Sequence, residues 1–183
     1  PTTSNSIAGD SSVCKNLAMS RALMLVDVQF CMVFGEWPVP DASPILSGIA
    51  NRLLQAREAG EQVVFVQNDG PEGELDAPGL PYWQLALQPA MSETVIRKTT
   101  QNVFESNPLL AQSLKASGVK EIELVGFQSE LCLRASAFGA LAEGFAIRLS
   151  RELHGTYDGD LSHKEISDRV QAELERAQNE SGY

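Results

Sequence analysis

The stretch that decides the fold is VGFQSELCLRASAFGALAEG, residues 125–144. A short apolar run ends near Gly126, a turn follows, and small residues with a helical period continue to Gly144. The pattern predicts a buried strand that passes into a helix, with Cys132 near the start of that helix. One explanation for this cysteine is packing, because free cysteine is among the residue types most often buried. The alternative is a reactive cysteine, because the N-terminus of a helix stabilises a thiolate.

The same alternation of strand and helix runs through the rest of the chain. Apolar runs predict strands at residues 21–29, 62–68, 94–98, 121–127 and 145–150. Besides the helix that carries Cys132, apolar periodicity and end signals predict helices at 43–60, 107–118 and 162–178. We therefore expect an α/β protein with a three-layer Rossmann-like fold, in which helices flank a mainly parallel central sheet.

Capping residues and one long loop add detail to this prediction. Ser43 is the expected N-cap of the first long helix, and Gly60 is its expected stop. Ser162 and Glu165 have the spacing of a capping box. Residues 69–92 are rich in Gly, Pro and acidic side chains, and a loop of this length within a compact domain is usually functional.

Composition limits the classes of function. With a formal net charge of −10, the chain is a poor candidate for binding nucleic acid or anionic membranes. We expect a polar, flexible tail at 1–20 without a signal-peptide core, then a single domain at 21–183. Three cysteines, Cys14, Cys31 and Cys132, without CxxC spacing favour a reducing compartment, so a cytoplasmic location is expected.

Three residues able to do chemistry fall at or just after predicted strand ends: Asp27, Lys98 and Cys132. Parallel α/β sheets bind ligands beyond the carboxyl ends of their strands, so we expect the three to meet. Lys98 would favour a Cys132 thiolate, and Asp27 could accept and return a proton. Taken singly, each residue also has a purely structural explanation. Asp27 could cap a turn, Lys98 could be a solvated surface charge, and Cys132 could be a packing residue. Two histidines, His154 and His163, leave a Cys–His pair open.

Three segments, LVDVQ, IRKTTQNVF and LVGFQSELCLRASAFGALAEGF, resemble the isochorismatase-like cysteine hydrolases. The resemblance runs from about residue 23 to residue 158, with the motifs in the family's order and spacing. It implies that Asp27 is the carboxylate, Lys98 the lysine and Cys132 the nucleophile. It also implies a cis peptide bond between Phe127 and Gln128.

The resemblance further implies an oxyanion hole and a pocket. The backbone N–H groups of Gln128 and Cys132 would form the oxyanion hole. The expected substrate-binding residues are Phe30, Trp83, Phe104 and Gln128. Trp83 could equally pack within its loop. Arg97 or Arg134 could bind a substrate carboxylate, although a surface or ion-pair role is the more ordinary one for arginine. A homo-oligomer is also implied.

Differences between this sequence and the motifs of related enzymes narrow the range of possible activities. Nicotinamidases of this superfamily carry an Asp-x-His and further histidines after the second strand, for a metal. The corresponding segment here, QNDGPEGELDAPG, has no histidine, so no metal and no other cofactor are expected. True isochorismatases hydrolyse a vinyl ether and lack the cysteine, so Cys132 argues against that activity.

These observations predict a metal-independent cysteine amidohydrolase that cleaves a small amide or related C–N bond through a thioester. Its partner would be a small-molecule substrate. One alternative is a catalytically silent scaffold, against which the intact Asp27, Lys98 and Cys132 set speaks. Another is a redox sensor in which Cys31 approaches Cys132. A nicotinamidase-like or isochorismatase-like hydrolase is the remaining alternative.

Overall fold

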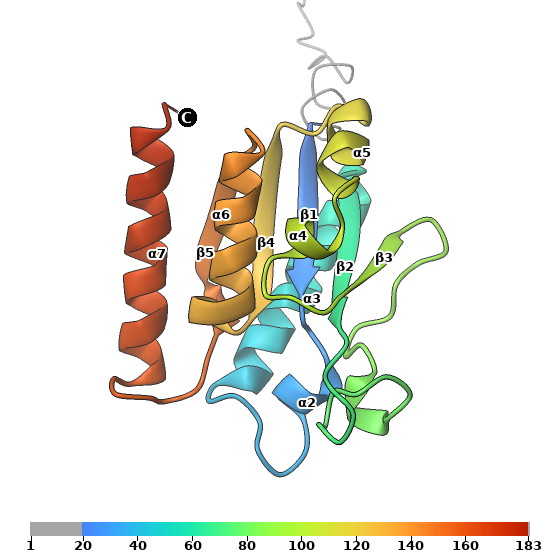
Figure 1. Ribbon diagram of the computed structural model, residues 1–183, viewed down its shortest axis with the longest axis vertical. Helices are drawn as coiled ribbons and strands as arrows, with labels where there is room; N and C mark the ends of the chain where they lie inside the picture. The colour runs from blue at the N-terminus through green and yellow to red at the C-terminus, as the bar shows by residue number, and fades with distance from the viewer. Residues whose placement is uncertain (1–19, 183) are drawn as a thin grey trace, which may run out of the picture.

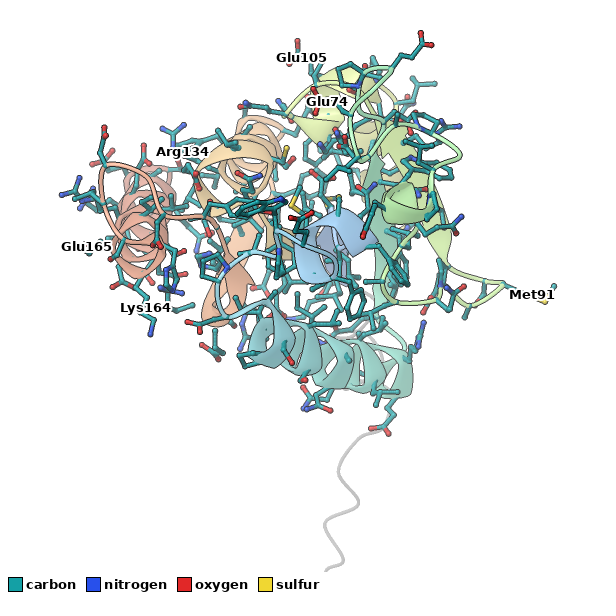
Figure 2. All side chains as sticks on the ribbon, turned by 90° about the horizontal axis from the view of Figure 1, so that it is seen from below. Glu74, Met91, Glu105, Arg134, Lys164 and Glu165 are labelled. Atoms are coloured by element: carbon teal, nitrogen blue, oxygen red, sulfur yellow. The ribbon has the colours of Figure 1, made fainter. Side chains whose placement is uncertain are left out.

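A computed structural model describes residues 20–182, so the predicted tail and Cys14 lie outside the described residues. All strand pairings are parallel, in the order β3-β2-β1-β4-β5. The strands are β1 (Arg21–Val26), β2 (Gln62–Asn68), β3 (Thr94–Lys98), β4 (Glu121–Phe127) and β5 (Ala146–Gly155). Their carboxyl ends share one edge of the sheet, the lower edge in Figure 1, and Figure 2 views the molecule from that side.

Helices cover both faces of this sheet (Figure 1). One face carries α2 (Phe30–Val33) and α3 (Ala42–Ala59). The other carries α4 (Val103–Ser106), α5 (Leu110–Ala116), α6 (Arg134–Ala142) and α7 (His163–Glu180). Two short turns, η1 (Pro81–Trp83) and η2 (Ser129–Leu133), complete the elements. The predicted three-layer α/β fold with a parallel sheet is confirmed.

Alternation along the strands explains the two layers of core. In β1, Met24 packs into the cluster under α4 to α7, while Leu23 and Leu25 pack into the cluster under α3. All three side chains are fully buried. A strand that is apolar on both faces is typical of a parallel sheet covered on both sides. On α3, apolar residues at helical spacing, Ile45, Ile49, Leu53 and Ala56, turn inward.

Several element boundaries differ from the prediction. The helix α3 begins at Ala42 with Asp41 as its N-cap, so the Ser43 cap is wrong, while Gly60 closes the helix as expected. The predicted 107–118 helix is shorter and is preceded by α4, and β5 continues five residues beyond the predicted end at 150. The capping box of Ser162 and Glu165 is confirmed.

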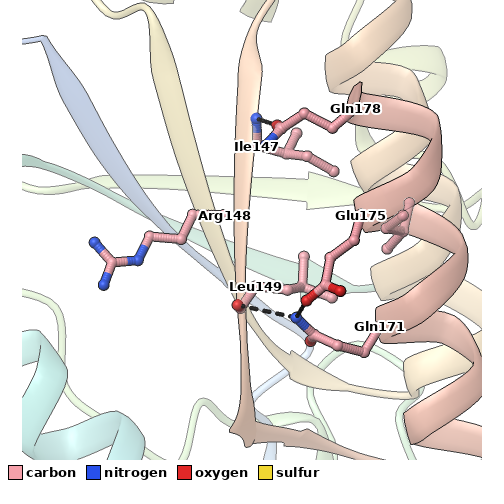
Figure 3. Close-up of a pocket in the computed structure, with 7 residues that line it drawn as sticks. Ile147, Arg148, Leu149, Gln171, Glu175 and Gln178 are labelled. Carbon is pink, nitrogen blue, oxygen red and sulfur yellow. Dashed lines mark hydrogen bonds between the residues drawn. The ribbon is translucent and has the colours of Figure 1, made fainter. Parts of the chain in front are cut away.

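Helix α7 covers the outer edge of the sheet at β5 (Figure 3). The Gln178 side chain accepts a hydrogen bond from the Ile147 backbone N–H, and the Gln171 amide donates to the Leu149 carbonyl. An uncovered edge strand offers its unpaired backbone groups to other chains, and these glutamines occupy two of them. Within residues 20–182, no helix is long and apolar enough to cross a membrane.

The carboxyl end of β4 depends on a glycine. Gly126 has φ +124°, and a Cβ atom at this position would lie 2.0 Å from the Val26 carbonyl oxygen of β1. The register of β4 with β5 also shifts between Leu124 and Gly126, as in a β-bulge. Only glycine combines this conformation with so close an approach of two strands.

We predict that Gly126→Ala destabilises the protein far more than Gly60→Ala. Both glycines have positive φ, but a Cβ atom at Gly60 meets no atom within 4 Å. Gly60→Ala should therefore cost about 1 kcal/mol of unfolding free energy, the usual left-handed penalty. Gly126→Ala should cost more than about 3 kcal/mol because backbone must move. Urea unfolding measures both values, and equal costs would contradict the close approach.

Candidate functional site

Asp27, Lys98 and Cys132 meet at the carboxyl edge of the sheet, as the sequence predicts. Asp27 directly follows β1, Lys98 ends β3, and Cys132 lies in η2 after β4. The Lys98 Nζ atom is 2.9 Å from Asp27 Oδ2 and 3.2 Å from Cys132 Sγ. Because β2 lies between β1 and β3, the lysine side chain reaches across the end of β2. Asp27 and Lys98 are only 2% and 1% exposed, so this ion pair is buried.

The backbone holds Asp27 in an uncommon conformation. Its φ is +52°, in the left-handed region, and its N–H donates to the Val66 carbonyl. Such conformations are retained where the surrounding structure enforces them, often at functional sites. Lys98 occupies Oδ2, while Oδ1 is buried and has no hydrogen-bond partner among the described residues. One carboxylate oxygen is thus left available for a proton.

Burial and charge set the proton affinities of the ion pair. Burial raises the pKa of Asp27, and the neighbouring Lys98 opposes this without cancelling it. Burial alone would lower the pKa of Lys98, but Asp27 and Cys132 outweigh it and raise that pKa. Lys98 therefore remains an ammonium group, and Asp27 is a stronger base than an exposed aspartate.

The surroundings of Cys132 favour the neutral thiol over the thiolate. Its pKa is raised to about 12, because burial disfavours the thiolate and the Asp27 carboxylate repels it. Lys98 lowers the pKa but does not outweigh these two effects. This direction runs against the expectation that Lys98 and a helix N-terminus hold a thiolate, and that expectation stays a prediction. The sulfur can become nucleophilic only as its proton leaves, and Asp27 is the adjacent base.

The turn η2 (Ser129–Leu133) presents the cysteine. It is a π-helical turn, and the Phe127–Gln128 peptide bond before it is cis, as the resemblance implies. The Gln128 carbonyl accepts hydrogen bonds from the N–H groups of Leu131 and Leu133. The oxyanion hole of Gln128 and Cys132 remains a prediction.

Neither histidine serves as a base for Cys132. His154 is fully buried and bonds to Ser129 Oγ through Nδ1 at 2.8 Å, and burial lowers its pKa to about 4. His163 bonds instead to Asp158 and Asp41 at the surface. Within the part of the chain that the structure describes, neither makes a hydrogen bond with Cys132. The Cys–His alternative is therefore not supported.

The predicted pocket residues divide into two groups. Phe30 is 37% exposed on α2, and the Gln128 amide lies 3.9 Å from Met32 Sδ of the same helix. Phe104, in contrast, is 7% exposed and stacks on Phe145 in the core, so the contacts support a packing role and its pocket role stays a prediction. Its apolar character serves packing between α4 and the sheet.

Trp83 and the two arginines have partners of their own. The Trp83 indole donates to Asp69 at 3.0 Å, and the Arg97 guanidinium lies over its ring while pairing with the same carboxylate. Arg134 pairs with Glu173. The packing role of Trp83 and the ion-pair roles of the arginines are thus the ones that the contacts support.

Cys31 is a buried thiol whose surroundings disfavour the thiolate. Its pKa is raised to about 12, first by burial and then by the negative charges of Asp76 and Asp27. Both Cys31 and Cys132 are free. A redox sensor needs an accessible thiolate, so these environments do not favour that alternative.

The loop after β2 shows residues that the sequence analysis missed. Asn68 Oδ1 accepts a hydrogen bond from Lys98 Nζ at 2.9 Å, and Asn68 Nδ2 donates to Asp76. The strand-end rule that identifies Lys98 applies equally to Asn68, the last residue of β2. Across residues 20–182, no group of three or more His, Cys, Asp or Glu side chains is arranged to hold a metal ion.

Known proteins are similar to this chain in sequence and in fold. The isochorismatase domain family matches residues 21–178. A streptothricin hydrolase of Streptomyces noursei is 41% identical over 156 residues, which are 84% of this chain and 56% of that protein. The ureidoacrylate amidohydrolase RutB of Stutzerimonas stutzeri is 24% identical over 185 residues, 80% of this chain and 71% of that protein.

A solved structure described as an isochorismatase family protein superposes with a TM-score of 0.75. It is 26% identical, over 84% of this chain and 92% of that one. The chain spans only 56% of the length of the streptothricin hydrolase that it matches. The domain match nevertheless begins in β1 and extends into α7, so the chain belongs to the isochorismatase family, as its motifs predict.

Proposed function

We propose that the protein is a metal-independent cysteine amidohydrolase that cleaves a small amide or a related C–N bond through a thioester. The observation that carries the proposal is the buried cluster in which one ammonium group contacts both a carboxylate and a cysteine sulfur. A catalytically silent scaffold has no use for such a buried charge pair, whose desolvation is costly.

In the first half-reaction, Cys132 Sγ attacks the substrate carbonyl carbon while its proton passes to Asp27, whose Oδ1 has no other partner. The carbonyl oxygen gains negative charge, and the N–H groups of Gln128 and Cys132 stabilise it. The tetrahedral intermediate then collapses. The C–N bond breaks, Asp27 returns the proton to the leaving nitrogen, and a thioester remains on Cys132.

In the second half-reaction, water replaces the amine. Asp27 accepts a proton from the water as its oxygen attacks the thioester carbon. When this second intermediate collapses, the C–S bond breaks, and the sulfur recovers the proton from Asp27. The net reaction is amide plus water to acid plus amine. Lys98 stays protonated throughout, since its pKa is raised, and it offsets the negative charge that moves between Asp27 and Cys132.

The relatives suggest which substrates to test. One is named for streptothricin and another for ureidoacrylate, and the second name denotes an amidohydrolase. Hydrolysis of streptothricin, ureidoacrylate and a panel of primary amides, followed by detection of the released amine or ammonia, would identify the substrate class. A small-molecule substrate, a homo-oligomeric assembly and a cytoplasmic location are part of the proposal, the last because both described cysteines are free.

Cys132→Ala should abolish hydrolysis while the fold persists. The variant removes the nucleophile, and the half-buried site tolerates a smaller side chain better than the core does. Mass spectrometry of the wild-type protein mixed rapidly with substrate should detect an acyl group on the peptide that contains Cys132. Undiminished turnover by Cys132→Ala would refute the mechanism.

Lys98→Met should lower kcat/KM by about 100-fold or more, because a preorganised charge inside a buried site is lost. Lys120 is exposed at the opposite end of the sheet, and Lys120→Met is the matched control. A screened surface charge contributes little, so the control should keep its activity. Steady-state kinetics on both variants make the comparison. Equal, small effects would remove Lys98 from the mechanism.

Exhaustive chelation should leave the rate unchanged. The loop after β2 offers carboxylates but no histidine, and two of those carboxylates, Asp69 and Asp76, already bond to Arg97 and Asn68. The thiol mechanism also needs no Lewis acid, since backbone N–H groups stabilise the oxyanion. Assays after dialysis against a chelator, together with elemental analysis, provide the measurement. Lost activity that returns with zinc, iron or manganese would support the nicotinamidase-like alternative instead.

A further inference from the structure

The Lys98 ammonium group has an acceptor for each of its three N–H bonds. Nζ lies 2.9 Å from Asp27 Oδ2, 2.9 Å from Asn68 Oδ1 and 3.2 Å from Cys132 Sγ. A lysine ammonium has three donors and no acceptor, so this set is complete. The asparagine takes the N–H that neither reactive group uses. Its position therefore determines how the other two N–H bonds are directed.

Asn68 is itself held on three sides. Its side-chain Nδ2 donates to Asp76 Oδ2 at 2.6 Å. Its backbone N–H donates to Gln29 Oε1 at 2.8 Å, and its carbonyl accepts from Gln29 Nε2 at 3.1 Å. An ammonium only donates and a carboxylate only accepts, so Lys98 and Asp76 together orient the amide with Oδ1 toward the lysine.

Asp76 reaches Asn68 because the loop after β2 folds back over a glycine. The Gly70 N–H donates to the Asp76 carbonyl at 3.0 Å. A Cβ atom at Gly70 would lie only 1.9 Å from Asp76 Oδ1, so a larger residue would displace the carboxylate. The acidic, glycine-rich loop thus delivers one particular carboxylate to the end of β2.

We propose that Asn68 and Asp76 are positioning residues that fix the Lys98 ammonium between Asp27 and Cys132, Asn68 by direct contact and Asp76 through Asn68. The proposal rests on the proposed hydrolase function, which assigns Lys98 its role, and it adds two residues that touch neither the sulfur nor the carboxylate of Asp27. It also gives the loop after β2 a function in catalysis.

The charge of Asp76 supplies a readout that a merely structural residue would not have. Burial raises the pKa of Asp27 most strongly, Lys98 and Cys132 lower it, and the negative charge of Asp76 raises it again. Asp76→Asn keeps the shape of the side chain and an acceptor for Asn68 but removes that charge. The pKa of Asp27 should then fall, and the acid limb of the pH profile of kcat/KM should move to lower pH.

Two single variants and one control test the proposal. Asn68→Leu removes the acceptor for Lys98 and should lower kcat by about 10-fold to 100-fold, with KM changed less than about 2-fold, because a small misplacement of a catalytic group is costly. Asp76→Asn should move the acid limb of the pH profile of kcat/KM to lower pH. Glu74 is an exposed acid of the same loop, visible at the surface in Figure 2, and Glu74→Gln should behave like the wild type.

The double variant Asn68→Asp/Asp76→Asn exchanges the two groups and provides a rescue. Asn68→Asp alone places two carboxylates in contact and should impair kcat. The exchange restores one amide–carboxylate hydrogen bond and an acceptor for Lys98, so kcat should recover severalfold. Thermal unfolding of each variant confirms that it is folded. If Asn68→Leu does not fold, the acid limb of Asp76→Asn and the rescue still decide the proposal.

A measurement without substrate separates this proposal from the hydrolase function. The rate at which iodoacetamide labels Cys132, followed by mass spectrometry, should fall in Asn68→Leu but not in Glu74→Gln, since a displaced ammonium stabilises the thiolate less. This result would support the positioning role even if Cys132→Ala retained hydrolysis. A different pair of results would overturn the positioning role and leave the hydrolase function intact. In that case Cys132→Ala abolishes hydrolysis, while the Asn68 and Asp76 variants keep the wild-type kcat, acid limb and labelling rate.

Discussion

The contact on which this site depends is the buried ion pair of Lys98 with Asp27. Asp27 follows β1 and Lys98 ends β3, two strands that are not neighbours, and the lysine crosses the end of β2 to reach the carboxylate. Removing one partner of such a pair would leave an uncompensated charge in the interior, which is strongly destabilising. The strand order, the left-handed turn at Asp27 and the loop after β2 are therefore linked to one another through this pair.

Much of this arrangement follows from the sequence. Apolar runs at 21–29, 94–98 and 121–127 predict parallel strands, and parallel strands bring their carboxyl ends together. One boundary that failed lies where residues far apart in the sequence meet. Asp41 replaces Ser43 as the N-cap of α3, where its carboxylate contacts His163 and Lys164 of a distant helix. A local capping rule has no access to that contact.

The site could be predicted in part for the same reason. Strand ends and motif spacing identify Asp27, Lys98 and Cys132, but they do not report burial, and burial raises the pKa of the cysteine. Phe104 illustrates the converse, because an aromatic residue near a reactive lysine suits either a pocket or a core. Its stacking on Phe145 from a later segment favours the core.

The raised pKa of Cys132 has a consequence for the lifetime of the protein in an oxidising or electrophilic environment. Peroxides and alkylating agents attack thiolates, and the raised pKa of Cys132 lowers the fraction of thiolate that is open to them at neutral pH. The sulfur is therefore less reactive between encounters with substrate, and in the proposed mechanism Asp27 removes its proton when a substrate occupies the site. Selectivity against adventitious reagents is thus built into the resting state by the same burial that makes Asp27 a strong base.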